Sequence, residues 1–117
     1  MDIKRINPGQ RMSQAVIHSN VVYLAGQVAV DAPGTEVATQ TSTILDQIDV
    51  LLRESGTDKS NLLYATIWLA SMDSFDEMNE VWDAWVSTDN TPARACVEAR
   101  LAAPQFTVEI AVIAAIN

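Results

Sequence analysis

The sequence predicts an α+β domain in which one sheet carries two helices on a single face. Two segments have the apolar spacing of amphipathic helices, and β-like runs separated by turn signals stand before, between and after them. This order of elements is typical of a two-layer sandwich, and it has a weak rhythm of two related halves. A chain of 117 residues is long enough for one such core, so we expect residues 1–117 to form a single domain.

The first part of the chain predicts three strands. Residues 3–6 form a short β-like run that ends at the turn signal Asn7-Pro8-Gly9. Residues 14–18 and 21–28 are rich in β-branched and other apolar side chains, and Ser19-Asn20 separates them. We expect these two runs to pair as an antiparallel hairpin.

Two helices are predicted from caps and spacing. From Val37 onward, apolar residues recur at intervals of three and four, and Gly56 is placed as a C-terminal cap, which predicts a helix of about five turns. Ser74 followed by Glu77 is a capping-box pattern and predicts that a second helix begins there. The apolar face of this second helix is expected to consist of Phe75, Met78, Val81, Trp82 and Trp85.

The run 62–70 lies between the two helices and is apolar at both parities, so we expect both faces of this strand to be covered. With both helices on one side, the other side of the sheet has no cover within the monomer. Tyr64, Trp68 and the polar residues near Arg94 cannot all face the helices, so the open face carries apolar area. Self-association through this face would place a concave, partly dry site around Arg94 at the subunit boundary.

Polar and small apolar residues alternate along segment 93–101. Arg94, Cys96, Glu98 and Arg100 share one parity, while alanine, valine and leucine occupy the other. This period of two predicts a strand with one polar and one apolar face.

A short connection, 102–105, leads to the β-branched run 106–114, and we expect the two strands to form an antiparallel hairpin. In that hairpin Glu109 lies near Glu98, and it lies one or two pairs from Arg94 on the same sheet face.

Arg94 and Glu109 are the catalytic candidates. A guanidinium can hold a substrate carboxylate through two parallel charge-assisted hydrogen bonds, and a carboxylate of shifted pKa can orient water and relay a proton. The alternative is a structural cross-strand pair of Arg94 with Glu98 or Glu109. Cys96 has no histidine near it in sequence to act as a base, so we assign it a lining role.

The composition argues against several classes of function. The net charge is −8, and with a pI of about 4.3 and no basic run the chain is a poor partner for nucleic acid. No apolar stretch approaches the roughly 20 residues of a membrane span, and no signal-like segment is present, so we expect a soluble, cytoplasmic protein without a membrane partner. The single cysteine gives no zinc signature, and no metal or other cofactor is expected.

Over essentially its whole length the chain resembles the RidA family, also called the YjgF/UK family. The resemblance rests on Ala25-Gly26-Gln27 in the third expected strand, on Asn79 in the second helix, and on Pro92-Ala93-Arg94-Ala95-Cys96-Val97-Glu98 followed by Glu109. It implies a chorismate-mutase-like fold, with a mixed six-stranded sheet, that assembles as a homotrimer with clefts between subunits. It also implies cofactor-independent hydrolysis of small carboxylated 2-imino or enamine acids to 2-keto acids and ammonia.

The resemblance also implies individual roles. Arg94 matches the arginine that binds the substrate carboxylate, and the backbone around Cys96 matches the water-binding position. Glu109 matches the glutamate that orients the attacking water or the substrate. Met12 and Ala25 stand where a tyrosine and a serine are usual, so a changed substrate range is expected. The full set expected to bind substrate is Met12, Ala25, Gly26, Asn79, Arg94 and Cys96.

Two rival functions remain. A small-ligand-binding or holdase-type protein could keep the RidA fold and lack efficient hydrolysis, since the hydroxyl groups usual at positions 12 and 25 are missing. Retention of both Arg94 and Glu109 favours the enzyme. A ribonuclease or translation inhibitor is the third function attached to the family, and the acidic charge without a basic patch argues against it.

Overall fold

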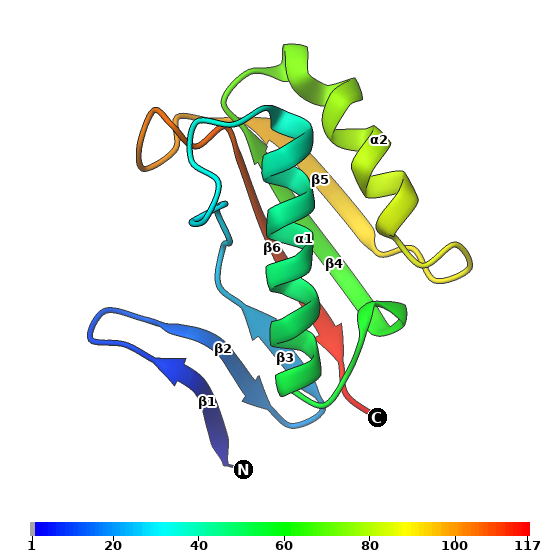
Figure 1. The fold of residues 1–117 in the computed structure, drawn as a ribbon. Coiled ribbons are helices and arrows are strands. Elements are labelled where there is room, and N and C mark those ends of the chain that lie inside the picture. Colours follow the sequence, from blue (N-terminus) through cyan, green and yellow to red (C-terminus); the bar gives the residue numbers. More distant parts are fainter. Residues whose placement is uncertain (1) are drawn as a thin grey trace.

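The computed structural model describes residues 2–117 and shows a six-stranded sheet with two α-helices on one face (Figure 1). The strands are β1 (Ile3–Pro8), β2 (Ser13–His18), β3 (Val21–Leu24), β4 (Leu62–Leu69), β5 (Ala93–Glu98) and β6 (Val108–Ala115). The helices are α1 (Val37–Glu54) and α2 (Phe75–Trp85). The spatial order is β1-β2-β3-β6-β4-β5, with β4 and β5 parallel and the other neighbours antiparallel. The predicted fold class, a mixed six-stranded α+β sandwich, is confirmed.

The core lies between the sheet and α1. Because side chains alternate along a strand, every second residue of β4 and β6 faces the helices. The fully buried residues of this kind are Ala65, Ile67, Leu69, Val108, Ile110, Val112 and Ala114. They pack with the buried stripe of α1, which consists of Ile44, Leu45, Ile48, Leu51 and Leu52. The apolar spacing of the sequence therefore predicts the core correctly.

β5 and β6 do not pair with each other, so the predicted closing hairpin is wrong. β4 lies between them, parallel to β5 and antiparallel to β6. Arg94 is in register with Ala65 and so faces the helices, whereas Glu109 is in register with Trp68 and faces the opposite side. The prediction relied on closeness in sequence. β4 is apolar and pairs along both of its edges, and this pairing outweighs the tendency of neighbouring segments to form a hairpin.

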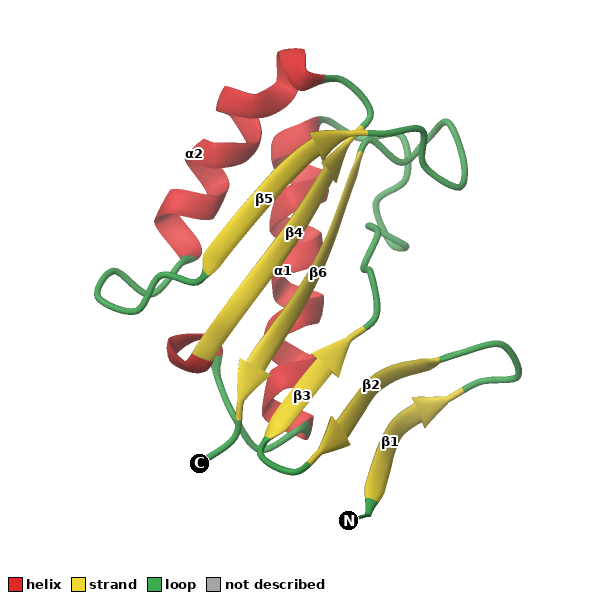
Figure 2. Cartoon of the chain, turned by 180° about the vertical axis from the view of Figure 1, so that it is seen from behind, coloured by secondary structure: helices red, strands yellow, loops and turns green. Residues whose placement is uncertain are grey.

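The sheet face opposite the helices is uncovered (Figure 2). Tyr23, Tyr64 and Val97 lie on this face and are 48%, 38% and 46% exposed. The expectation that the open face carries apolar area is confirmed. The expectation that both faces of β4 are covered is wrong for one protomer, because only the side with Ala65 is buried.

The helix ends agree only in part with the sequence signals. Gly56 follows α1 with φ +86°, as expected for a C-terminal cap. Ser74 makes no capping hydrogen bond, because it belongs to a 3₁₀ turn that precedes α2 and has ψ 4° rather than an extended backbone. Glu77 instead accepts a hydrogen bond of 2.9 Å from the backbone N–H of Ala38. Within residues 2–117, neither helix combines the length and the apolar character that crossing a bilayer requires.

Candidate functional site

Arg94 and Asn79 meet where β5 lies against α2. Nη1 of Arg94 donates a hydrogen bond of 2.8 Å to Oδ1 of Asn79. The guanidinium carbon lies 5.4 Å from the ring centroid of Trp82 and 5.9 Å from that of Phe75, within the range of cation–π attraction. The partner is a neutral amide, so this contact orients the guanidinium without neutralising its charge. The cross-strand pair with Glu98 or Glu109 that was the structural alternative is not the contact that Arg94 makes.

Cys96 lies on the same helix-facing side of β5 as Arg94. Partial burial raises the pKa of its thiol, and the nearby charge of Arg94 opposes this only in part. The sulfur therefore stays protonated near neutral pH and is a poor nucleophile, in agreement with a lining role. In the described part of the chain, residues 2–117, no three or more His, Cys, Asp or Glu side chains are grouped to hold a metal ion.

Glu109 lies on the open sheet face and packs against Gly26. A Cβ built on Gly26 would overlap Oε2 of Glu109 and lie 3.0 Å from its Cδ. Segment 25–27 is fixed beside β6 because Gln27 and Ile110 exchange two backbone hydrogen bonds of 2.8 and 3.1 Å. Partial burial raises the pKa of Glu109. The glycine of the Ala25-Gly26-Gln27 motif therefore leaves room for the carboxylate.

One protomer does not bring Arg94 and Glu109 together. They lie on opposite faces of the sheet, two strands apart, with Glu109 and Val97 both in register with Trp68. At ordinary strand spacing and rise, this register separates the two Cα atoms by about 14 Å. β5 is an edge strand, so Arg94 stands at a rim of the sheet. A site that uses both side chains is complete only with a second copy of the chain.

A cavity of about 580 Å³ lies between α1, the β1–β2 turn and segment 26–30; we call it the α1 cavity. Met12 and Gly26 line it, as does Gln27, whereas Ala25 does not. Sequence reasoning missed Val50 and Val30, which also line it. The sequence offered one signal for Val50, which is an apolar residue outside the apolar stripe of the predicted helix. In the structure its side chain is 44% exposed on the outer side of α1.

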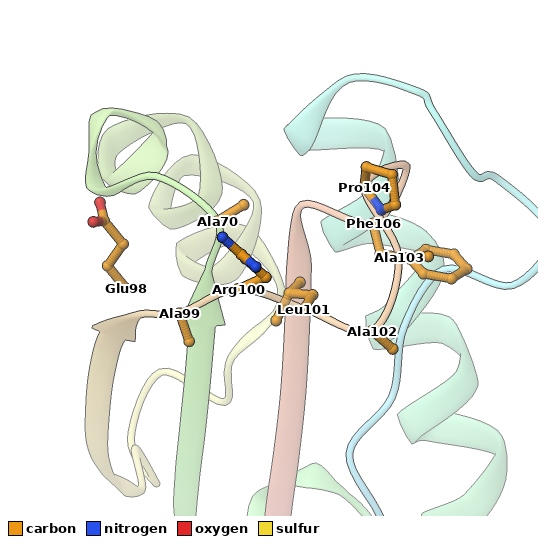
Figure 3. A pocket seen from close by; sticks show the side chains of 9 residues that line it. All are labelled: Ala70, Glu98, Ala99, Arg100, Leu101, Ala102, Ala103, Pro104 and Phe106. Atoms are coloured by element: carbon orange, nitrogen blue, oxygen red, sulfur yellow. The ribbon is translucent and has the colours of Figure 1, made fainter.

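A second hollow, of about 470 Å³, lies beside the end of β5 and the loop that follows it (Figure 3). Glu98, Arg100, Pro104 and Phe106 are among the nine residues that line it. It contains none of the candidate site residues, and Glu98 accepts a hydrogen bond of 2.9 Å from the backbone N–H of Met72. Arg100 is therefore a suitable comparison for Arg94.

Gly26→Ala is expected to displace the carboxylate of Glu109, because the added methyl group occupies its position. The flexible end of Glu109 can move, so we expect a small loss of stability and a loss of any Glu109-dependent activity of about a hundredfold. Thermal unfolding and steady-state kinetics measure the two effects. In a Glu109→Ala background, Gly26→Ala should lower stability and activity only slightly further. A full additional loss in that background would contradict the steric explanation.

Three comparisons with known proteins cover nearly the whole chain. The family model described as endoribonuclease L-PSP matches residues 2–116. A RutC family protein from Haemophilus ducreyi is 46% identical over 98% of this chain and 97% of its own length. The RutC family protein YoaB from Escherichia coli is 43% identical over 99% of this chain and its full length. The crystal structure of NMB1025, a YjgF-family protein from Neisseria meningitidis, is 45% identical, covers 100% of this chain and 97% of its own, and has a TM-score of 0.96.

Proposed function

This chain belongs to the endoribonuclease L-PSP family, with RutC-type and YjgF-type relatives, and on that premise we propose that it is a cofactor-independent deaminase. Its substrates are small carboxylated 2-imino or enamine acids, which it hydrolyses to 2-keto acids and ammonia. The observation that carries the proposal is the guanidinium of Arg94, oriented by the neutral amide of Asn79. An oriented cation that retains its charge is suited to an anionic ligand.

Arg94 binds the substrate carboxylate in this mechanism. Its fork donates two parallel hydrogen bonds to the two carboxylate oxygens, which fixes the adjacent imine carbon in position. The bond to Asn79 and the rings of Phe75 and Trp82 restrict the guanidinium before substrate arrives, so less side-chain freedom is lost on binding. The backbone around Cys96, two residues along β5, lies beside the bound acid and holds the water.

Glu109 transfers the protons. Its carboxylate accepts a proton from the water as the water oxygen attacks the imine carbon, and the imine nitrogen takes up a proton to give a neutral carbinolamine. Glu109 then takes the proton of the hydroxyl group and gives it to the amino nitrogen, the carbon–nitrogen bond breaks, the nitrogen leaves as ammonia, and the hydroxyl oxygen becomes the keto oxygen. The imine carbon is already electrophilic, so positioned water and a proton relay are sufficient. A pKa raised by burial brings the carboxylate closer to the pH at which it must exchange protons.

The two side chains come from neighbouring subunits of a homotrimer. In support of this assembly, the open face that bears Glu109 also exposes Tyr23, Tyr64 and Val97, an apolar surface suited to a partner subunit. The edge strand of one copy, laid across the open face of the next, brings Arg94 to Glu109. Sedimentation equilibrium at micromolar concentration should report a trimer, and a monomer would remove the shared site.

Two other functions compete with the deaminase. A ligand-binding or holdase-type protein would bind small acids without turning them over, and the absence of hydroxyl groups at Met12 and Ala25 favours it. The family description includes endoribonuclease activity, but the net charge of −8 disfavours binding to a phosphate backbone. The retained pair of Arg94 and Glu109 favours the deaminase over both.

The deciding experiment supplies defined imines. An amino-acid oxidase generates 2-imino acids in the presence of semicarbazide, and the protein competes with the trap, so the rate of semicarbazone formation reports hydrolysis. The wild-type protein should lower that rate severalfold for at least one imine. If it changes the rate for no imine while still binding 2-keto acids in calorimetry, the ligand-binding function replaces the deaminase. Cleavage of a labelled RNA in a parallel assay would support the ribonuclease instead.

A further inference from the structure

We propose, resting on the deaminase function above, that Gln27 is a positioning residue for the reaction. Its buried amide joins β2 and α1 to segment 25–28, and in this way it holds Gly26 against the carboxylate of Glu109. The glycine of the Ala25-Gly26-Gln27 motif leaves room for the carboxylate, and the glutamine that follows keeps this glycine in place.

A one-residue bulge turns Gly26 and Gln27 toward opposite sides of the sheet. β3 pairs with β6 as far as Tyr23 and Ile113, and the pairing resumes where Gln27 lies opposite Ile110. Between these two pairs the first segment advances four residues while β6 advances three, as in a β-bulge. Ile110 is buried on the helix side, so Gln27 opposite it faces α1, and Gly26 faces the open side.

The side chain of Gln27 ties this bulge to two other elements. Its Nε2 donates hydrogen bonds to Oε1 of Gln14 in β2, at 3.0 Å, and to the carbonyl of Ala25, at 3.1 Å. Its Oε1 accepts a hydrogen bond of 3.1 Å from Nε2 of Gln47 in α1. Gln27 is only 7% exposed, so these contacts take the place of water and allow the amide a single orientation.

The backbone on both sides of Gly26 is fixed by side-chain amides. A bulge interrupts the hydrogen-bond ladder of a sheet, so carbonyl groups near it need other donors. Gln27 supplies one to Ala25, and Gln47 supplies another to the carbonyl of Val28, at 3.0 Å. Gly26 has no side chain that could anchor it, so its position follows from these neighbours.

The link from α1 destabilises the fold in one respect. Oε1 of Gln47 is buried and makes no hydrogen bond within residues 2–117. A buried acceptor without a partner lowers the stability of the folded state. The amide at position 47 is therefore tolerated for the donor that it supplies to Gln27 and Val28.

The contact at Gly26 is how the amide network acts on Glu109. The backbone of Gly26 packs so closely against the carboxylate that even a methyl group in its place would overlap Oε2. Partial burial raises the pKa of Glu109 and limits the directions in which the carboxylate can point. A loosened segment 25–28 would admit water, return the pKa of Glu109 toward its ordinary value and cost the carboxylate its orientation toward the attacking water.

The test replaces Gln27 by methionine, which keeps the length of the side chain and removes the amide. Carboxyl ¹³C NMR titration, assigned by comparison with Glu109→Gln, should show the pKa of Glu109 shifted toward 4.5. In the semicarbazide assay, Gln27→Met should lower kcat about tenfold and leave KM within about twofold. In a Glu109→Gln background, it should lower the residual kcat by less than about twofold, because Gln27 acts through Glu109. Gln47→Met removes only the link to α1 and should give smaller changes in the same direction.

Leu52→Val controls for a general loss of stability. Leu52 is fully buried in α1, near the end of the helix. This end lies by the last residues of β6, where Thr57 donates a hydrogen bond to the carbonyl of Ala115, whereas Glu109 stands at the start of that strand. The smaller side chain should lower the midpoint of thermal unfolding and leave both kcat and the pKa of Glu109 unchanged. Gly26→Ala displaces the carboxylate directly and should shift the pKa of Glu109 in the same direction as Gln27→Met.

The outcomes separate the positioning role from the deaminase function. The positioning role is wrong, and the deaminase function stands, if a folded Gln27→Met protein keeps the wild-type kcat or the wild-type pKa of Glu109. It is also wrong if Gln27→Met lowers kcat equally with and without Glu109. If the wild-type protein hydrolyses no imine, the deaminase function fails, and the titration of Glu109 alone decides whether Gln27 holds the carboxylate. If Gln27→Met does not fold, Gln47→Met decides by the same measurements.

Discussion

Arg94→Ala is expected to lower kcat/KM for 2-imino acids by at least about a hundredfold, because loss of a charge-assisted, two-point contact removes both binding and orientation of the substrate. Most of the loss should appear as a higher KM, since the carboxylate is bound in the ground state and in the transition state alike. Arg94→Lys keeps the charge and loses the fork, so it should recover only part of the activity. The semicarbazide assay gives both constants.

Two comparison variants sharpen the Arg94 result. Arg100→Ala removes an arginine six residues further along the chain that lines the other hollow, and it should leave kcat/KM within about twofold. Asn79→Ala leaves the guanidinium charged but without its partner, so we expect an intermediate loss. Full activity in Arg94→Ala would refute the assignment of the carboxylate-binding residue even if imine hydrolysis is observed.

Glu109→Gln is expected to lower kcat by about a hundredfold to ten-thousandfold with little change in KM, the usual range for loss of a general acid–base group. Glutamine is nearly the same size as glutamate, so the contact with Gly26 is kept. Glu77→Gln, which changes a glutamate that binds the backbone of Ala38, is the control and should leave kcat unchanged. A Glu109→Gln protein with wild-type kcat would show that another group moves the protons.

The pH dependence of the wild-type enzyme follows from the same carboxylate. Burial raises the pKa of Glu109 above its ordinary value of 4.5, and the reaction uses the ionised form, so kcat should fall on the acid side of the profile with a midpoint above pH 4.5. Stability changes in the opposite direction. The folded state holds this proton over a pH range in which the unfolded state has lost it, so the contribution of Glu109 to stability decreases as pH rises through that range. Glu109→Gln should remove this part of the pH dependence in thermal unfolding.

Sequence patterns predicted the local structure well and the pairing of distant strands poorly. The apolar spacing from Val37 identified α1 and its buried stripe, and the positive φ of Gly56 confirmed its end. The hairpin of β5 and β6 was wrong because strand pairing depends on contacts far apart in sequence. The register with β4, which places Arg94 and Glu109 on opposite faces, cannot be deduced from alternation within each strand alone.

The candidate site shows the same limit. Glu109 stood out in the sequence because it interrupts an apolar strand, and Arg94 because it belongs to the polar face of segment 93–101 and to the motif that carries the family resemblance. Only the folded structure shows the contact of Arg94 with Asn79 and the space that Gly26 leaves for Glu109. The α1 cavity was not predicted, because the segments that line it are separated by many residues and none carries a signal of its own.

The central claim is that Arg94 of one subunit and Glu109 of its neighbour form one hydrolytic site. Co-expression of Arg94→Ala and Glu109→Gln chains with two different tags allows hybrid trimers to be purified. In a cyclic trimer, either mixed composition contains one interface at which both native side chains meet, so the hybrids should show about a third of the wild-type rate although both parents are nearly inactive. Hybrids of Arg94→Ala with the double variant provide the control and should stay inactive. Hybrids of the two single variants that are no more active than their parents would contradict the shared site.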